Sequence, residues 1–534
     1  MKALRLAGLA RLSLVALFGL VGAPLYAQDG NGTWKNAGGD VADTHSTQAG
    51  RALDPENVPA LTVKWIFTAA GNITATPVVQ GDAIYVADWG GKVHKVDRRT
   101  GSTLWSHFVS EYTGNPASFV RGSPAIGDDA VVFGDQVSGT VIAVDQRSGS
   151  LLWKTVLDPH PLAVVTGSPV IAENRVYIGL ASQEEVTVRD IPTYVPTFRG
   201  QTAALDLRTG AIIWQFRTVP LGYTGGAVWQ STQAVDLRRR SLYVGTGNNY
   251  TVPPDVQACI SATTNPEQQL ACRDPADLID SVLSLDLDTG RLKWAFRSRG
   301  ADIFTALCVV VPASCPFPHD DYDFGAGPNL FKLSRSGPSQ GSDGNGVREV
   351  VGVGQKSGIY YAIDPDTGSM LWATMVGPGG LFGGIEWGTA ADGERVYVAL
   401  ANSEHQRYQL QPGGQFWDSG SWAALDALTG KVLWQTPATG QDPRPPAGRG
   451  ALALGMVSVA NGVMYASANG GDFVALDAAT GRILWTFPSG GTVIGGPAIV
   501  GDTLYWGTGY DKRGRGIANN KLYAFFVPLV QASR

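Results

Sequence analysis

The feature of this sequence that most restricts its fold is a short motif, Asp-x-x-Thr/Ser-Gly followed by a tryptophan, that recurs along the chain. One copy is FVALDAATGRILWTF (Phe473 to Phe487), and six earlier copies include VIAVDQRSGSLLW and YYAIDPDTGSMLW. Each copy follows a segment such as RVYVALA or SLYVGTG, in which alternating β-branched and aromatic residues indicate a β-strand. The motif therefore predicts a tight turn in which aspartate caps backbone N–H groups, glycine adopts a positive φ, and tryptophan packs against the neighbouring repeat.

The spacing of these tryptophans predicts a closed ring of repeats. With the tryptophan of LTVKWIF included, eight of them occupy equivalent positions: Trp65, Trp105, Trp153, Trp214, Trp294, Trp372, Trp434 and Trp485. Repeats of roughly 40 to 50 residues with four strands each are typical of β-propellers. The tail NNKLYAFFV supplies a strand without its tryptophan, and Trp65 lacks a preceding strand. We therefore expect an all-β, eight-bladed propeller closed by N- and C-terminal strands that share the last blade, rather than an open solenoid.

The N-terminal segment indicates export. Lys2, Arg5 and Arg11 precede an apolar run, and small residues at Ala23 and Ala27 offer a cleavage point, which is the layout of a secretory signal peptide. The apolar run is shorter than the ~20 residues that a membrane-spanning helix needs. We predict a signal peptide over residues 1–27, a propeller domain over 28–534, and a periplasmic protein. The formal net charge of −5 shows no basic footprint for nucleic acid.

The cysteines fit the same compartment. Cys259 and Cys272 flank one loop, and Cys308 and Cys315 flank another, so two local disulfides are the simplest pairing, although four cysteines allow three connectivities. The sequence contains no Cys-x-x-Cys-His motif for covalent haem. Its glycine-rich segments, such as GDDAVVFGDQ, lie inside β repeats rather than at a strand-to-helix turn, so nicotinamide binding is not predicted.

The candidates for chemistry are the polar residues that depart from the repeat. They are His319, Asp320, Asp321 and Asp323 in PHDDYDFGAGPNLF, Lys356 in VGVGQKSGIYYAID, Asn248 and Asn249 in YVGTGNNYTVP, and Glu184 and Glu185 in IGLASQEEVTVRD. Taken singly, each of them could cap a turn or lie on a solvated surface. Together they supply hard oxygen ligands and one cation, all at strand ends.

At these residues the sequence resembles the pyrroloquinoline quinone (PQQ) dependent alcohol dehydrogenases, which are eight-bladed propellers. Within this family it is most similar to the polyvinyl alcohol dehydrogenases, through GTGNNYTVP, DYDFGAGP, VGVGQKSGIYYAIDPDTG, GGIEWG and NNKLYAF. The resemblance implies PQQ and a Ca²⁺ ion as cofactors. It implies a catalytic role for Asp323, as general base, and for Lys356, at the quinone carbonyls. The remaining implied roles are metal ligation by Glu184, Asn248 and Asp323, and cofactor contacts by Arg121, Thr166, Ser182, Gln183, Trp229, Lys356 and Glu386.

The sequence also departs from the family pattern. The adjacent-cysteine ring that covers PQQ in methanol dehydrogenases is absent near Arg121, where the sequence is NPASFVRG, and Thr74 and Glu386 stand where the family has a glutamate and an asparagine. Gly325 stands where lanthanide-using relatives carry a further aspartate, which favours calcium. The insertion VTVRDIPTYVPT follows Glu184. These departures suit a more open site for a bulky or polymeric alcohol.

The expected function is therefore oxidation of alcohols, among them the secondary alcohols of polyvinyl alcohol, by hydride transfer to PQQ, with electrons passed to a separate cytochrome c. Two alternatives remain open. One is a quinoprotein dehydrogenase for another alcohol, a sugar or an aldehyde. The other is a non-enzymatic propeller scaffold like the outer-membrane assembly lipoprotein, which shares the docking repeat but needs no such set of carboxylates and ammonium.

Overall fold

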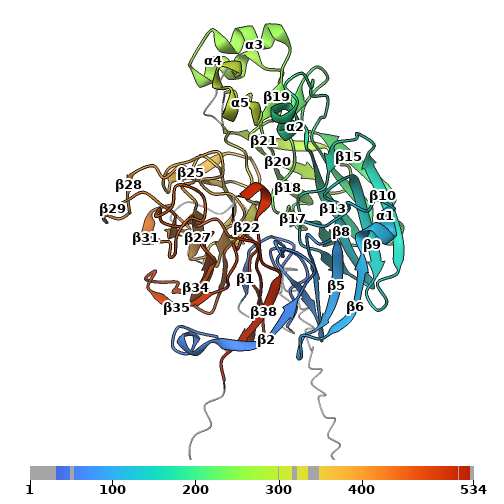
Figure 1. Ribbon diagram of the computed structural model, residues 1–534. Helices are drawn as coiled ribbons and strands as arrows, with labels where there is room; N and C mark the ends of the chain where they lie inside the picture. The colour runs from blue at the N-terminus through green and yellow to red at the C-terminus, as the bar shows by residue number, and fades with distance from the viewer. Residues whose placement is uncertain are drawn as a thin grey trace, which may run out of the picture.

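The computed structural model describes residues 32–47, 53–298, 300–315, 321–334, 348–514 and 516–528. These residues form eight antiparallel blades around an axis, with further short strands and helices between them (Figure 1). The prediction of an all-β, eight-bladed propeller is confirmed. The predicted signal peptide, His319 and Asp320 lie outside the described residues.

The first four blades follow the chain in order, each strand pairing with the next. They are β3 (Val78–Gln80), β4 (Ala83–Ala87), β5 (Lys92–Asp97) and β6 (Thr103–Phe108); β7 (Ala125–Gly127), β8 (Ala130–Gly134), β9 (Gly139–Asp145) and β10 (Leu151–Asp158); β12 (Val170–Ala172), β13 (Arg175–Ser182), β14 (Gln201–Asp206) and β15 (Ile212–Arg217); and β17 (Ala234–Asp236), β18 (Ser241–Gly245), β20 (Ser281–Asp286) and β21 (Leu292–Arg297).

The last four blades repeat this plan, and the final one takes a strand from the N-terminal part. They are β22 (Asn329–Lys332), β23 (Glu349–Gly354), β24 (Ile359–Ile363) and β25 (Met370–Met375); β26 (Ala390–Ala391), β27 (Arg395–Leu400), β30 (Ser421–Asp426) and β31 (Val432–Pro437); β32 (Ser458–Ala460), β33 (Val463–Ser467), β34 (Asp472–Asp477) and β35 (Ile483–Pro488); and β36 (Ala498–Val500), β37 (Thr503–Gly507), β38 (Lys521–Phe526) and β2 (Thr62–Thr68).

The repeated motif joins each blade to the next through its tryptophan and its glycine. In one turn, the N–H and the hydroxyl of Thr480 both donate to Asp477 Oδ1 at 2.9 Å. Gly481 has a φ of +72°, and a Cβ there would lie 2.4 Å from Cε3 of Trp434 in the preceding blade. Trp434 Nε1 donates to the carbonyl of Ala478 at 3.1 Å. Glycine is therefore required both for the backbone conformation and for the indole that packs on it, as the motif predicted.

The ring closes where the sequence predicts. Strand β2 pairs antiparallel with β38, so that Trp65 lies opposite Ala524. Trp485 of the seventh blade donates its indole N–H to Leu61, just before β2, at 3.1 Å. In Figure 1, β2 and β38 lie side by side although they come from opposite ends of the chain. This closure leaves the propeller without an open sheet at the point where the ring begins and ends.

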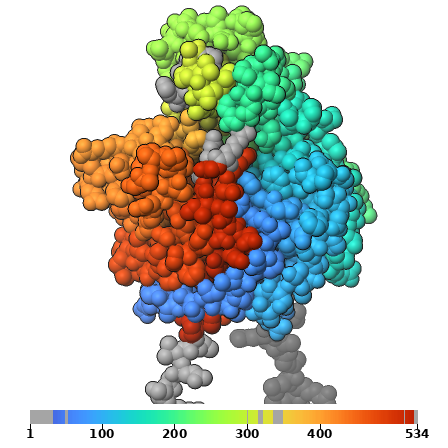
Figure 2. Space-filling view, viewed as in Figure 1, coloured from blue at the N-terminus to red at the C-terminus, as the bar shows by residue number. Residues whose placement is uncertain are grey.

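Insertions between strands gather at one edge of the molecule, seen at the top of Figures 1 and 2. They carry β11 (Ala163–Val164), α2 (Glu184–Asp190), β16 (Thr224–Gly225), β19 (Asn249–Thr251), α3 (Pro254–Ser261), α4 (Pro266–Cys272), α5 (Leu307–Val310) and η2 (Pro312–Ser314). Disulfides join Cys259 to Cys272 and Cys308 to Cys315, which confirms the pairing of neighbours. The other short elements are β1 (Ser46–Thr47), η1 (Val58–Ala60), α1 (Val109–Thr113), β28 (Tyr408–Gln409), β29 (Phe416–Trp417) and η3 (Lys512–Gly514).

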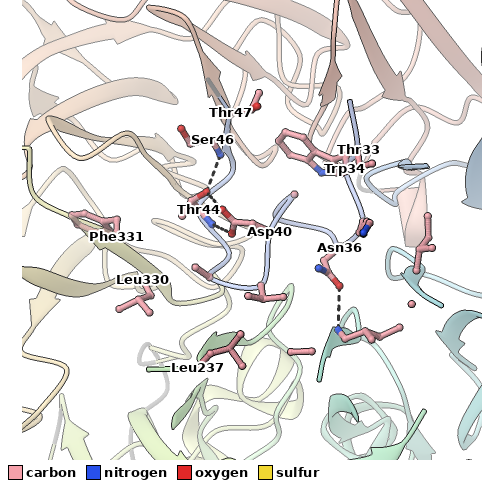
Figure 3. Close-up of a pocket in the computed structure, with 18 of the residues that line it drawn as sticks. Thr33, Trp34, Asn36, Asp40, Thr44, Ser46, Thr47, Leu237, Leu330 and Phe331 are labelled. Atoms are coloured by element: carbon pink, nitrogen blue, oxygen red, sulfur yellow. Dashed lines mark hydrogen bonds between the residues drawn. The ribbon is translucent and has the colours of Figure 1, made fainter. Parts of the chain in front are cut away.

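An N-terminal segment that the repeat does not predict closes one end of the axis. Residues 34–47 run around this end and bond to the first strand of seven blades. Trp34 and Val79 each donate a backbone N–H to the other's carbonyl, and the side-chain Oδ1 of Asn36 accepts the N–H of Ile171. The carbonyls of Lys35, Val41, Ala42, Thr44 and His45 accept the backbone N–H groups of Ile126, Val235, Leu330, Ala391 and Val459, in that order. A cavity of about 690 Å³ remains between this segment and the strand ends, and Figure 3 shows Trp34, Asn36 and Asp40 around it.

Within the part of the chain that the structure describes, no helix has both the length and the apolar character needed to cross a membrane.

Candidate functional site

Several of the predicted site residues meet at the other end of the axis. Arg121, Thr166, Trp229, Asp323 and Glu386 each lie a few residues before the first strand of a blade, namely β7, β12, β17, β22 and β26. The axial segment, in contrast, contacts these first strands and the residues that follow them. Because the first strands of a propeller all run in the same direction, the residues that precede them share one opening. We call this opening the mouth.

Asp323 is held on both of its oxygens. It is almost fully buried, its Oδ1 accepts the backbone N–H of Asn248 at 2.7 Å, and its Oδ2 accepts the indole N–H of Trp229 at 2.7 Å. The backbone N–H of Lys356 donates to the Asp323 carbonyl at 3.1 Å. These contacts come from two different blades and give this carboxylate a single orientation at the mouth.

The ammonium of Lys356 lies between two carboxylates. Its Nζ is 2.8 and 3.0 Å from the two oxygens of Asp321, and 3.4 Å from Oδ2 of Asp323. Lys356 follows β23 in a turn where Gly358 N donates to Gln355 O at 3.0 Å. Lys356 and Asp321 are 8% and 5% exposed, so this ion pair is shielded from solvent and its geometry matters more than that of a surface pair.

The charges around Lys356 are unbalanced. Burial alone would lower the pKa of Lys356, but Asp321, Asp323, Glu386 and Glu185 together raise it well above its ordinary value. Burial raises the pKa of Asp321 well above its usual range, against the opposing effect of Lys356, and Asp323 and Glu185 raise it further. Four carboxyl groups thus act on one ammonium in a buried region, and such an excess is costly unless a further cation balances it.

Asn248 is oriented by its amide nitrogen. Nδ2 donates to the carbonyls of Asn249 and Phe304, each at 2.7 Å, so Oδ1 is the atom of this amide that could act as a metal ligand. The residue lies between β18 and β19 and is buried. Because its backbone N–H also holds Asp323, a cation at this amide oxygen would be close to the Asp323 carboxylate.

Glu184, the predicted metal ligand from α2, is engaged elsewhere. Its Oε1 accepts from the Tyr194 hydroxyl and the Thr197 N–H, both at 2.8 Å, and its Oε2 accepts from Phe198 N at 2.8 Å. It also lies 3.1 Å from His160 Nε2. The carboxylate therefore ties the end of the following insertion to α2. Its neighbour Glu185, a candidate from the sequence to which the resemblance gave no role, is the glutamate whose charge acts on both Lys356 and Asp321.

Aromatic side chains form a wall beside these charges. Trp229 and Trp387 are edge to face, with centroids 5.6 Å apart. The Arg121 guanidinium lies 4.6 Å from the ring centre of Trp387, and Lys356 Nζ lies 4.9 Å from that of Trp229. A Cβ on Gly325 would lie 2.5 Å from Cη2 of Trp229. Packing against this indole therefore gives a physical reason for glycine at position 325.

Three other predicted cofactor contacts, Thr166, Ser182 and Gln183, form hydrogen bonds with residues outside the Asp323–Lys356 cluster. Thr166 is buried and accepts a hydrogen bond from Gln136 Nε2 at 3.2 Å. Ser182 bonds to the Tyr250 hydroxyl, whose pKa is raised by burial and by nearby carboxylates. Gln183 stands just before α2, where its N–H donates to Leu162 O at 2.8 Å.

Thr74, which replaces the family's glutamate, links two sides of the mouth. Its hydroxyl donates to the Arg121 carbonyl at 2.9 Å and accepts the Trp89 indole N–H at 2.8 Å. Trp89 in turn packs against Phe119 and Tyr510, with centroids 5.4 and 5.5 Å away. The first and last blades are therefore connected here through aromatic rings.

Several residues of this cluster were not selected from the sequence. They are Tyr250, Asp302 and Trp387. Asp321 and Glu185 were among the candidates, but the resemblance assigned them no role. Asp302 is fully buried, accepts Tyr322 N at 2.9 Å, and has its pKa raised well above the usual range by burial and by Asp280 and Asp321.

Among the described residues, no three His, Cys, Asp or Glu side chains converge closely enough to hold a metal by themselves. The oxygen donors that meet at the mouth are instead the carboxylate of Asp323 and the amide of Asn248, and the charge of Glu185 acts on the neighbouring Lys356 and Asp321. Ca²⁺ takes six to eight such oxygens. The donor chemistry therefore fits a calcium ion that completes its shell with oxygens from a bound cofactor or from water.

Comparison with known protein families matches most of the chain. The family described as outer membrane protein assembly factor BamB matches residues 62–267, 355–441 and 418–525. These segments contain the docking repeats, so this match reflects the propeller repeat itself.

Comparison with individual proteins finds dehydrogenases. The chain is 32% identical to a polyvinylalcohol dehydrogenase of Sphingopyxis sp. (strain 113P3), over 89% of this chain and 74% of that one. It is 29% identical to a polyvinylalcohol dehydrogenase of Pseudomonas sp, over 92% and 77%. The crystal structure of quinohemoprotein alcohol dehydrogenase from Comamonas testosteroni superposes with a TM-score of 0.68 at 20% identity, over 93% of this chain and 80% of the other.

Proposed function

The chain belongs to the family of PQQ-dependent alcohol dehydrogenases, and we propose that it oxidises alcohols in the periplasm with PQQ and Ca²⁺ bound at the mouth of the propeller. The observation that carries this proposal is the buried arrangement of Asp323 with Lys356 and Trp229, at 3.4 and 2.7 Å from the same carboxylate oxygen. A carboxylate that is buried, oriented and next to a cation suits proton transfer more than structural capping.

The residues at the mouth fit PQQ, a flat molecule with three carboxylates. Trp229 offers an aromatic face, and Arg121 and Lys356 offer cations close to the two indoles. These two cations do not balance the four carboxyl groups already present around Lys356, and an anionic cofactor increases the excess. We therefore propose a divalent cation held by Asp323, Asn248 and Glu185, with Glu185 in place of Glu184.

Asp323 would act as the general base. Bound PQQ would supply the hydride acceptor, and bound Ca²⁺ would polarise it as a Lewis acid. Asp323 Oδ2 accepts the proton of the substrate hydroxyl, while the Trp229 indole and the Asn248 N–H keep the carboxylate aligned. Base catalysis of this kind is worth about 10²–10⁴ in rate. Arg121, Thr166, Ser182, Gln183 and Glu386 would contact the cofactor around its edge.

Two further features are part of the proposal. The sequence holds no covalent haem motif, so electrons from reduced cofactor would pass to a separate cytochrome c. Two disulfides suit an exported protein in an oxidising compartment, which agrees with the N-terminal sequence.

The substrate that we favour is polyvinyl alcohol. The support comes from two relatives of that name at 32% and 29% identity. It also comes from Val309 and Val310 of α5 and from Val311 just after it, which are 47–57% exposed; α5 is in contact with α2 at the mouth. Apolar side chains near the opening suit the hydrocarbon part of a polymeric alcohol. A small alcohol, a sugar or an aldehyde is the second candidate, because the inserted loops at the mouth would select the substrate.

The test begins with purified protein incubated with PQQ and CaCl₂. We expect the cofactor to quench the fluorescence of Trp229 and to remain bound through gel filtration, and we expect dye-linked turnover with an alcohol. Polyvinyl alcohol, ethanol and glucose are compared at equal hydroxyl concentration. Cofactor binding with turnover of another substrate would replace only the substrate assignment. Failure to bind PQQ in the presence of Ca²⁺ would leave the propeller as a scaffold.

A further inference from the structure

The closest partner of Lys356 is not the candidate base but Asp321, two residues earlier in the same segment. Nζ makes contacts of 2.8 and 3.0 Å with both oxygens of Asp321, which is the normal range for a charge-assisted bond, and it lies 3.4 Å from Asp323, at the outer limit for any hydrogen bond. We propose that Asp321 is a positioning residue that holds the Lys356 ammonium away from Asp323. This inference rests on the function proposed above.

The backbones that carry the three side chains are anchored. Tyr322, between the two aspartates, donates its N–H to the buried carboxylate of Asp302 at 2.9 Å. The backbone N–H of Lys356 donates to the carbonyl of Asp323 at 3.1 Å. The position of the ammonium therefore depends on the flexible lysine side chain, and the partner of that side chain decides where it rests.

Removing the Asp321 charge would redirect the ammonium. Lys356 is 8% exposed, so its ammonium has little access to water and must pair with a carboxylate within the cluster. Asp323 is the nearest one after Asp321, since its Oδ2 is already 3.4 Å away. A shift of about 0.6 Å gives a normal ion pair at about 2.8 Å.

Such a shift would affect the base directly. Oδ2 of Asp323 already accepts the Trp229 indole N–H at 2.7 Å. A second close donor at the same oxygen would occupy the lone pair that the substrate hydroxyl needs. Asp321 thus leaves Lys356 close enough to serve the cofactor while Asp323 stays open to the substrate.

The experiment compares Asp321→Asn and Asp321→Glu with the wild type, all reconstituted with PQQ and Ca²⁺. The matched control is Asp236→Asn, because Asp236 is also a buried aspartate paired with a cation, 3.0 Å from Arg239, but at the end of β17 that faces away from the mouth. The readouts are kcat and KM, PQQ affinity from Trp229 fluorescence, and crystal structures of the cofactor-free variants.

For Asp321→Asn we expect kcat to fall about 10-fold to 100-fold, with KM and PQQ affinity changed less than about threefold. In the cofactor-free crystal structure, Lys356 Nζ should lie within hydrogen-bond distance, about 2.8 Å, of Asp323 Oδ2. Asp321→Glu restores the charge and should recover part of kcat, whereas Asp236→Asn should alter thermal stability but not kcat.

An unchanged kcat in Asp321→Asn, or a lysine that stays at its wild-type distance from Asp323, would overturn the proposal. So would an equal loss of kcat in Asp321→Asn and Asp321→Glu, because the charge would then have no role. If wild-type protein neither binds PQQ nor turns over an alcohol, the proposed function fails. The crystal structures of the cofactor-free variants still decide whether Asp321 positions Lys356.

Discussion

The two ends of the propeller axis both bury charged side chains, but the charges have different neighbours. At the closed end, Asp43 and His45 lie 3.1 Å apart, close enough for an ion pair but not aligned for a hydrogen bond. Both belong to one short segment that bonds to seven blades, six of them through its backbone and one through the Asn36 side chain. At the mouth, Asp323 precedes β22 and Lys356 follows β23 of the same blade, and Asp323 receives further contacts from Trp229 and Asn248 of another blade.

This difference means that the residues that stabilise the fold are not the residues that would carry out the chemistry. The axial segment and the docking tryptophans join the blades without using any side chain of the mouth. The mouth can therefore keep an excess of carboxylates that a purely structural site would not retain, since each buried carboxylate without a cation costs stability. Substitutions at the mouth should therefore mainly alter turnover, whereas substitutions at the closed end should mainly alter stability.

The largest effect that we expect is on turnover, in Asp323→Asn. The amide cannot accept the substrate proton, so kcat should fall by about 10²–10⁴. PQQ binding should persist, because Trp229 and Arg121 are unchanged. The measurement is dye-linked kcat together with PQQ quenching of tryptophan fluorescence. Turnover at the wild-type rate would remove Asp323 from the mechanism.

Asp43→Asn is the counterpart at the closed end. Burial raises the pKa of Asp43 from 3.8 to about 6, with His45 opposing and Asp40 adding to the shift. Because the folded protein binds this proton more tightly than the unfolded chain, the contribution of Asp43 to stability is greatest below pH 4 and declines as the pH rises through 6. The decline totals up to about 3 kcal/mol. Asp43→Asn should remove it.

The measurement is urea unfolding between pH 4 and pH 8, followed by tryptophan fluorescence. We expect the stability of Asp43→Asn relative to wild type to improve from pH 4 to pH 7, with kcat unchanged. A pH dependence identical to that of the wild type would show that this carboxyl does not hold its proton in the folded state.

The fold was predictable because the sequence motif that determines it is repeated along the chain. Seven blades carry the same capped turn and docking tryptophan, and the eighth carries Trp65 without the turn, so the pattern reveals the number of blades and the closure through Trp65. The axial segment was not predictable, since most of its bonds use backbone groups, as in Lys35 O and Ile126 N, and backbone groups leave no trace in the sequence.

The convergence of several candidate residues was predictable from the sequence, but their contacts were not, and their roles stay predictions. Asp323, Lys356, Trp229 and Asn248 do come together, as the resemblance implies. Glu184 and Glu185 are adjacent on the first turn of α2, and consecutive residues of a helix point in different directions. Sequence alone does not show which of them meets the insertion at Tyr194 and which faces Lys356. Which glutamate takes which position depends on the path of the insertion after α2, whose end bonds to Glu184.

A smaller effect is expected from Gly325→Ala. The added Cβ would lie 2.5 Å from Trp229 and 2.9 Å from the carbonyl of Glu386, so the indole must move. Overpacking of this kind costs about 1–3 kcal/mol, and displacement of Trp229 should also weaken PQQ binding. Gly388→Ala is the control, because its nearest neighbour is the flexible side chain of Met456 at 3.2 Å. Equal PQQ affinity in both variants would argue against Trp229 as the cofactor's aromatic face.

The smallest effect is expected from a substitution in one of the repeated turns, away from both ends of the axis. Asp477→Ala removes the carboxylate that accepts Thr480 N and the Thr480 hydroxyl, both at 2.9 Å, in one of the repeated turns. A partly exposed turn of this kind should lose about 1 kcal/mol of unfolding free energy, and the other docking turns keep the ring closed. Because no residue of the mouth contacts this turn, kcat and PQQ affinity should equal those of the wild type. A kinetic defect without a change in unfolding free energy would mean that the geometry of this turn influences the mouth. The residues that stabilise the fold and those of the site would then not be independent.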